Sequence, residues 1–172
     1  MFKFPSIVVL ALGASTVAVL VWMNRVEPIL SGTVDRILIE KSKRMMSLFR
    51  DGKILKTYSI ALGFNPEGHK QQEGDGRTPE GIYWIDWRNP QSKYHLSLHI
   101  SYPNAEDIQS AVACGVSPGC DIMIHGLPNG ADIAGTGSLA MDWTAGCIAV
   151  TNAEIEEIWA TVPDGAEVEI LP

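Results

Sequence analysis

The chain has 172 residues, a formal net charge of -7 and a sequence isoelectric point near 5.0. Without an apolar stretch at its start, about 140 residues remain, enough for one domain with a single hydrophobic core but too few for a second folded domain. The acidic balance and the absence of a Lys/Arg cluster argue against nucleic acid as a partner, because such binding requires neutralisation of phosphates.

Residues 1–30 are predicted to form a signal anchor or a signal peptide. Lys3 precedes an uncharged apolar run over residues 7–23. As a hydrophobic helix this run would measure about 25 Å, slightly less than the hydrocarbon layer of a bilayer. The apolar core continues to Met23 without an obvious cleavage site, so we favour an uncleaved anchor in the inner membrane over a cleaved signal. Either version would export the remaining chain, which would then face the periplasm or the outer surface, and we expect the periplasmic side of the cell envelope.

The segment from Val34 to Leu62 is predicted to form two or three strands, because apolar residues alternate along it and Asp51-Gly52 is a typical hairpin turn. Residues 63–80 contain six glycines and prolines among polar residues, which predicts a surface loop. An aromatic strand is then expected over residues 81–87.

The next strand is predicted at residues 94–101, where apolar and polar residues alternate. This pattern predicts one buried face and one polar face, with His95 and His99 on the polar face. Together with Tyr102, these histidines are candidates to line a substrate groove. The alternative is that they are exposed or hydrogen-bonded surface groups.

Two short apolar runs carry the most reactive side chains. Residues 122–124 lead into His125, and residues 147–150 begin with Cys147. Thr151 and Glu154 have the spacing of a capping box that opens a short helix. With a last alternating strand near the C-terminus, these elements predict a mainly β fold. We expect a single β-rich domain over residues 34–172, a sandwich or barrel-like sheet with one or two short helices.

In an oxidising compartment, three cysteines leave at least one thiol unpaired. Cys114 and Cys120 bracket a tight loop and could form a small-ring disulfide, although two free thiols are also compatible with the sequence. Cys147 is then the remaining thiol. It follows Gly146, and His125 precedes Gly126; glycine allows the sharp turn and close backbone approach that a reactive thiol and an oxyanion site require.

The motifs Ile124-His125-Gly126 and Thr144-Ala145-Gly146-Cys147 resemble those of the L,D-transpeptidase catalytic domain family, also called YkuD-like. The resemblance covers roughly residues 34–171, and the run over residues 94–104 is more similar to the YafK-like branch. It implies a YkuD-like β fold and a cysteine-dependent acyltransferase that needs no metal or other cofactor.

The same resemblance implies the roles of individual residues. Cys147 would attack a peptidoglycan stem tetrapeptide and form a thioester, with His125 as its base and the Gly126 carbonyl orienting the imidazole. The backbone N–H groups of Gly146 and Cys147 would stabilise the oxyanion, and Thr144 belongs to the turn that presents them. An amine acceptor from a neighbouring stem or a protein gives a cross-link or an attachment.

Two departures from the family pattern keep other functions open. Many members carry polar residues where this chain has Ala145 and Ala149. Hydrolysis of the acyl-enzyme would make the protein an L,D-carboxypeptidase or amidase, and loss of turnover would leave a peptidoglycan-binding module. A zinc hydrolase using Cys114, Cys120, His125 and His99 is the remaining rival, although the spacing of the two cysteines is outside the usual ligand spacing.

Overall fold

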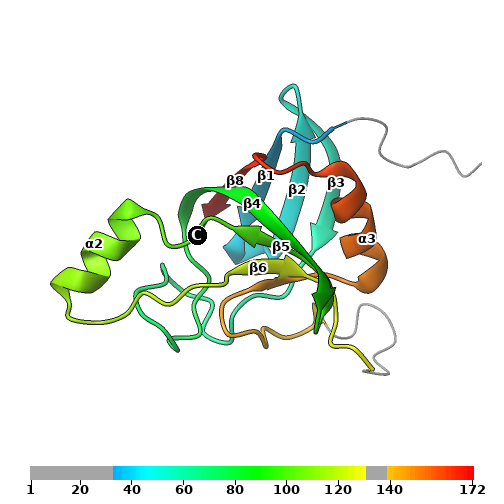
Figure 1. The fold of residues 1–172 in the computed structure, drawn as a ribbon. Helices are drawn as coiled ribbons and strands as arrows, with labels where there is room; N and C mark the ends of the chain where they lie inside the picture. The colour runs from blue at the N-terminus through cyan, green and yellow to red at the C-terminus, as the bar shows by residue number, and fades with distance from the viewer. Residues whose placement is uncertain (1–32, 131–138) are drawn as a thin grey trace, which may run out of the picture. The chain divides into compact units, whose positions relative to one another are not determined.

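The computed structural model describes residues 33–130 and 139–172, which belong to one compact unit (Figure 1). The predicted hydrophobic helix at residues 7–23 lies outside the described residues. Within the part of the chain that is described, no helix is long and apolar enough to cross a membrane.

Eight strands form one mixed sheet in the order β3-β2-β1-β8-β4-β5-β6-β7. The pairs β1–β8 and β6–β7 are parallel, and the other neighbours are antiparallel. The strands are β1 (Arg36–Glu40), β2 (Met45–Arg50), β3 (Lys53–Ser59), β4 (Gly81–Ser92), β5 (His95–Ile100), β6 (Met123–His125), β7 (Ile148–Ala149) and β8 (Glu167–Leu171). The predicted mainly β domain is therefore confirmed.

The first hairpin forms where the sequence predicts it. Asp51 and Gly52 both have positive φ angles, 51° and 72°, as a two-residue turn between twisted strands requires. The alternating residues of β1 and β2 point into the core: Ile37, Ile39 and Leu48 are fully buried.

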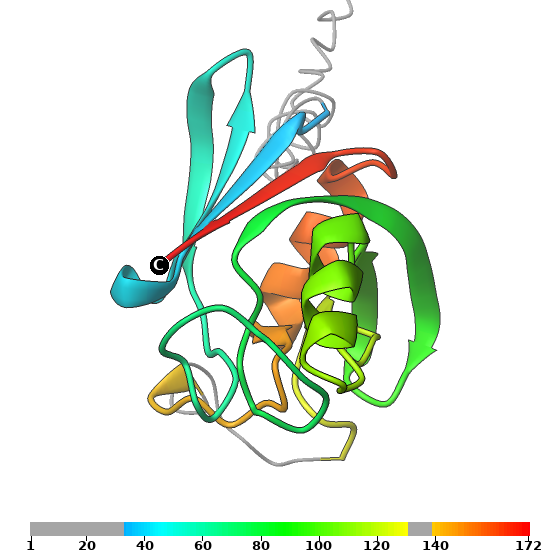
Figure 2. The same ribbon diagram turned by 90° about the vertical axis from the view of Figure 1, so that its left-hand side faces the viewer.

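β4 joins the two halves of the sheet. Its first residues pair with β8, and its later residues pair with β5 after a register shift near Ile85. Figure 2 shows this strand curving from one half to the other. Beyond β3, Ala61 exchanges two backbone hydrogen bonds with Ala149 of β7, at 3.0 and 2.9 Å. The sheet is thus linked back to its own far edge, which gives the barrel-like arrangement and explains why β7 can be short.

In the described part of the chain, two α-helices accompany the sheet. α3 (Asn152–Thr161) opens with the predicted capping box of Thr151 and Glu154, and it packs against β5. The second helix, α2 (Ala105–Ala113), was not located by the sequence analysis. It also begins with a capping box, in which Asn104 accepts two backbone N–H groups and Asp107 bonds back to the cap. Both helices begin where local polar side chains satisfy their first N–H groups.

β5 has one apolar and one polar face, as predicted, but part of the polar face is buried as well. Ser97 and His99 are buried, with 1% and 8% of their surface exposed, as are the apolar residues between and after them. The ring of Trp87 from β4 stacks on the His99 imidazole at 5.0 Å and covers part of this face. The alternation of apolar and polar residues predicts which side chains share a face of the strand. Whether that face is buried depends on neighbours from elsewhere in the chain.

Candidate active site

The parallel pair β6–β7 brings His125 and Cys147 together. Ile124 pairs with Ile148, and His125 with Ala149, so that Cys147 lies across from Met123. Cys147 immediately precedes β7, so the register continued by one residue sets it beside Met123, two residues before His125 along β6. The two residues are then about 7 Å apart along the chain direction, on neighbouring segments about 4.8 Å apart.

His125 is held in one tautomer by the next residue. Its Nδ1 lies 2.6 Å from the carbonyl oxygen of Gly126, as the family resemblance implied. A carbonyl only accepts, so Nδ1 carries the hydrogen and Nε2 retains its lone pair in the neutral ring. Gly126 must be glycine here, because an added Cβ would lie 2.7 Å from the side-chain oxygen of Asn152. Asn152 in turn accepts the N–H of Leu127 at 2.8 Å and fixes this strand end.

Two aromatic rings enclose the His125 imidazole, and the sequence patterns did not assign either to the site. Tyr94 lies 4.5 Å from it and Trp143 5.7 Å, between ring centroids. His125 is only 3% exposed. Burial lowers the pKa of His125 below its usual 6.5, because a charged ring would lose hydration; the hydrogen bond to Gly126 offsets part of this effect. The resting imidazole is therefore neutral at pH 7.

Cys147 is partly accessible, and its thiol also rests in the neutral form. Burial raises its pKa above the usual 9.0; the N–H of Met123 and the charge of Lys70 act in the opposite direction. The Met123 N–H donates to Sγ at 3.4 Å, and the thiol lies 3.5 Å from the carbonyl oxygen of Asp121. The backbone leading into β6 thus positions the sulfur before any base acts on it.

Thr144 holds the 144–147 turn in shape. Its hydroxyl donates to the carbonyl oxygen of Cys147 at 2.7 Å and accepts the N–H of Gly146 at 3.1 Å. Its backbone is bonded to Leu62 and Phe64 of the neighbouring segment. Thr144 is 4% exposed, so these bonds form in a low-dielectric environment where they are not in competition with water.

Gly146 is required by the close approach of the 63–80 loop. Its φ is 135°, and an added Cβ would lie 2.6 Å from the carbonyl oxygen of Arg77. Because its N–H already bonds to Thr144, the predicted oxyanion role of Gly146 would require that bond to break. The Cys147 N–H makes no hydrogen bond within the described residues and is the available donor of the predicted pair.

The 63–80 loop was predicted as surface, but its inner residues are buried against the turn. Lys70 is 3% exposed, and its Nζ donates to Asp75 at 2.8 Å and to the carbonyl of Gln72 at 3.0 Å. Burial by itself raises the pKa of Asp75, but the hydrogen bonds from Lys70 and from backbone N–H groups outweigh this effect and lower the pKa to about 2. This ion pair, which the sequence reasoning missed, fixes the loop that packs on Gly146.

Asp142 fixes the other side of the turn. It accepts two N–H groups of Arg44 at 2.9 and 2.8 Å, and the backbone N–H of Leu62 at 2.9 Å. The segment that leads to Cys147 is therefore tied to Arg44, the residue just before β2, and to the segment that follows β3. Of the two alanines that depart from the family pattern, Ala145 is exposed and Ala149 is fully buried in the backbone link to Ala61.

The three residues predicted to line a substrate groove are engaged elsewhere. His99 lies 2.5 Å from Asp86, and His95 lies 2.7 Å from Glu156 of α3. Tyr102 is 2% exposed, and its hydroxyl donates to the carbonyl of Pro118 at 2.9 Å. Their surroundings favour the alternative interpretation, that they are structural or hydrogen-bonded surface groups.

All three cysteines are free thiols in the structure, and Cys114 and Cys120 are both exposed. The suggested disulfide is therefore absent here. Within residues 33–130 and 139–172, no three or more His, Cys, Asp or Glu side chains are arranged to hold a metal ion. The geometry gives no support to the zinc hydrolase hypothesis.

Comparison with known proteins places this arrangement among related domains. The family model of the YkuD L,D-transpeptidase catalytic domain matches residues 34–170. The putative L,D-transpeptidase YafK of Escherichia coli (strain K12) is 31% identical over 140 residues, 77% of this chain and 49% of YafK. The chain thus spans about half the length of the curated relatives it matches.

Solved structures show the same fold. The helical cell shape determining protein Pgp2 of Campylobacter jejuni is 26% identical with a TM-score of 0.60, over 81% of this chain and 48% of Pgp2. An L,D-transpeptidase of Xylanimonas cellulosilytica has a TM-score of 0.52 at 17% identity, over 92% of this chain and 70% of that chain, and supports the fold alone.

Proposed function

The chain belongs to the L,D-transpeptidase catalytic domain family, as its motifs predicted, and from this premise we propose that it is a peptidoglycan L,D-transpeptidase acting through a Cys147 thioester. The observation that carries the proposal is the β6–β7 register. The thiol of Cys147, just before β7, borders the strand that ends in His125, and the imidazole of His125 is held in the tautomer that leaves the lone pair on Nε2.

In the proposed first step, Nε2 of His125 takes the proton of the Cys147 thiol, and the sulfur attacks the carbonyl carbon of the L-centre in a stem tetrapeptide. The Cys147 N–H stabilises the oxyanion. When the tetrahedral intermediate collapses, the bond to the terminal D-residue breaks and its amine receives the proton from His125. A thioester on Cys147 remains.

In the second step, an amine from a neighbouring stem or a protein attacks the thioester and gives its proton to His125. The new amide forms as the thiolate leaves, and His125 returns the proton to Cys147. Water in place of the amine would give carboxypeptidase activity by the same route. The buried neutral pair favours this general-base mechanism over a preformed ion pair, because burial disfavours both charged forms.

The test uses the full chain in detergent with tetrapeptide muropeptides, followed by mass spectrometry. We expect release of the terminal D-residue and formation of dimers. Cys147→Ala should abolish both products, whereas Cys114→Ala, the same change at an exposed thiol, should leave them unchanged. Turnover by Cys147→Ala would refute the mechanism, and release without dimers even with excess amine acceptor would identify a hydrolase.

We further propose that the domain acts on the periplasmic side of the cell envelope. The proposal rests on the apolar run over residues 7–23 and on the location of peptidoglycan stem peptides. A reporter fused at the C-terminus that is active only after export tests it, and activity of a cytoplasm-only reporter would refute it.

A further inference from the structure

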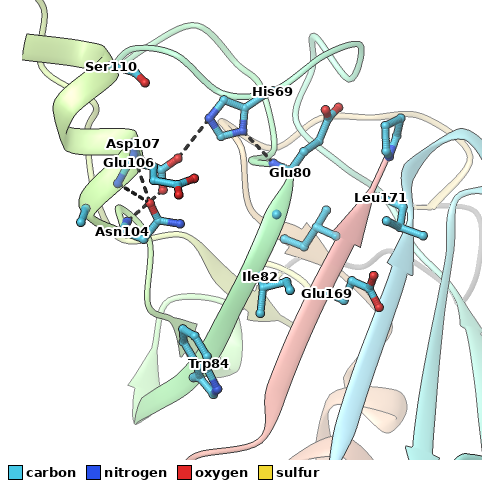
Figure 3. A pocket seen from close by; sticks show the side chains of 14 residues that line it. His69, Glu80, Ile82, Trp84, Asn104, Glu106, Asp107, Ser110, Glu169 and Leu171 are labelled. Carbon is cyan, nitrogen blue, oxygen red and sulfur yellow. Dashed lines mark hydrogen bonds and ion pairs between the residues drawn. The ribbon is translucent and has the colours of Figure 1, made fainter. Parts of the chain in front are cut away.

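A hollow of about 930 Å³ lies between α2, the outer face of β4 and the end of β8 (Figure 3). None of the residues that line it belongs to the 144–147 turn, so it is separate from the reactive thiol. Its volume is within the range of small-molecule binding sites. The proposed mechanism makes no use of it.

One wall of the hollow is an apolar, aromatic platform. Ile82 and Trp84 project from the outer face of β4 and remain 49% and 47% exposed, while Tyr83 between them points into the core. Leu171 at the end of β8 extends this surface and is 40% exposed. An exposed indole offers a large flat apolar face together with a polar N–H at its edge.

The opposite wall carries polar groups from the start of α2. Asn104 uses its side-chain oxygen to accept the N–H groups of Glu106 and Asp107. Its amide nitrogen therefore remains a donor, and Figure 3 shows it on the side of Asn104 that faces β4. The side chains of Glu106 and Ser110 also line the hollow. The two hydrogen bonds at the start of α2 hold the Asn104 side chain in this orientation.

The charges around the hollow favour a neutral ligand. None of its lining residues is Lys or Arg, which disfavours an anion. Most of its carboxylates already have cationic or hydrogen-bonding partners: Glu80 pairs with Lys41 at 2.7 Å, and Asp107 accepts from Tyr83 at 3.1 Å. A cation would therefore gain little from these carboxylates, because most of their negative charge is already balanced by the partners named above. Oxygens of these groups can still accept hydrogen bonds, since a carboxylate has about four lone-pair sites.

We propose that this hollow binds the sugar rings of a peptidoglycan glycan strand. The apolar C–H face of one ring stacks on Trp84, and its polar substituents bond to the Asn104 amide and the Glu106 carboxylate. The inference deepens the proposed function and rests on it for the identity of the glycan. Stacking on an aromatic face with hydrogen bonds around the ring edge suits a neutral polyhydroxylated ligand such as a pyranose, which has an apolar C–H face and polar substituents at its edge.

The 63–80 loop connects this hollow to the catalytic turn. His69 lines the hollow, where its Nε2 lies 3.1 Å from Asp107 and its Nδ1 accepts the backbone N–H of Glu80 at 3.0 Å. Lys70, the next residue, contributes charge at Cys147, and Arg77 contacts Gly146. A glycan bound in the hollow would therefore lie beside the loop that borders the site for its own stem peptide.

The test measures binding of chitotetraose, a neutral β-1,4-linked N-acetylglucosamine oligomer, by isothermal titration calorimetry. The protein is the full chain carrying Cys147→Ala, in a detergent without a sugar headgroup. This variant cannot turn over, so a failure of glycan binding and a failure of catalysis are recorded separately. We expect saturable binding, weakened about tenfold by Trp84→Ala as expected for loss of one stacking contact.

Trp87→Ala is the matched control, because Trp87 is a similarly exposed indole of β4 that does not line the hollow. It should leave the affinity unchanged. Asn104→Asp keeps the oxygen that caps α2 but removes the amide donor, and should weaken binding severalfold. Absence of binding, equal effects of the two tryptophan changes, or binding of a sugar-free stem peptide that is lost on Trp84→Ala would overturn the proposal.

Discussion

His125 at the end of β6 and His99 on β5 are both buried, and Nδ1 of each lies beside an oxygen acceptor. What differs is the charge of that acceptor and the group beside each ring. Nδ1 of His125 faces a backbone carbonyl, which is neutral and leaves Nε2 with its lone pair. Nδ1 of His99 faces the carboxylate of Asp86, and its ring lies under Trp87. The comparison teaches that burial and a free ring nitrogen do not by themselves make a base: the Cys147 thiol borders the strand of His125, whereas the neighbour of the His99 ring is Trp87.

Replacing His125 should have the largest effect. His125→Gln removes the proton acceptor, and we expect turnover of tetrapeptide muropeptides to fall by about 10²- to 10⁴-fold, the usual contribution of general acid–base catalysis. Initial rates of D-residue release at pH 8 measure it. A residual rate within about threefold of the unaltered chain would show that the base lies elsewhere.

Disturbing the turn opposite His125 should have the next largest effect. Thr144→Val removes the hydroxyl that bonds to Gly146 and Cys147 while keeping the side-chain shape. We expect kcat to fall about ten- to a hundredfold, since two buried hydrogen bonds of about 1 kcal/mol each position the thiol. Thr144→Ser should restore most of the rate. If the serine variant is as impaired as the valine variant, the hydroxyl is not the important group.

Opening the aromatic enclosure should change the pH profile more than the maximal rate. Tyr94→Leu admits water to the imidazole, so the lowered pKa of His125 should rise toward 6.5. The neutral base is lost below its pKa, and the acid limb of kcat/KM should therefore move to higher pH. The rate at pH 8 should change little. A limb that moves to lower pH would contradict the role given to burial.

Removing His99 should have the smallest effect. His99→Gln keeps a polar side chain beside Asp86 and removes no group from the site, so turnover should stay within about twofold to threefold of the unaltered chain. The same muropeptide assay measures it. A loss as large as that of His125→Gln would restore His99 to the substrate groove that its strand pattern first suggested.

Turn and helix-cap residues in the sequence predicted the elements whose ends depend on a few neighbouring residues. Asp51-Gly52 specified the first hairpin, and Thr151 with Glu154 specified the start of α3. His125 and Cys147 were predicted as a pair by their motifs, and the parallel register of β6 and β7 sets the segments that carry them side by side.

Contacts between distant segments were not predictable in this way. Tyr94 and Trp143 are separated by many residues from His125 in sequence and meet it only in the folded sheet. Tyr102 has the same polar hydroxyl whether exposed or buried, and only the fold shows that it bonds to Pro118. Pattern analysis assigns directions to side chains but does not identify what covers them.

The most direct test of the account is the pH dependence of Cys147 acylation by a carbapenem, followed by intact mass and peptide mapping of the full chain. We predict a mass increase confined to Cys147, with a rate that falls only below pH 6.5 because the pKa of His125 is lowered. Acylation of Cys114 or Cys120 instead, or an acid limb above pH 6.5, would contradict a neutral His125 acting as base for Cys147.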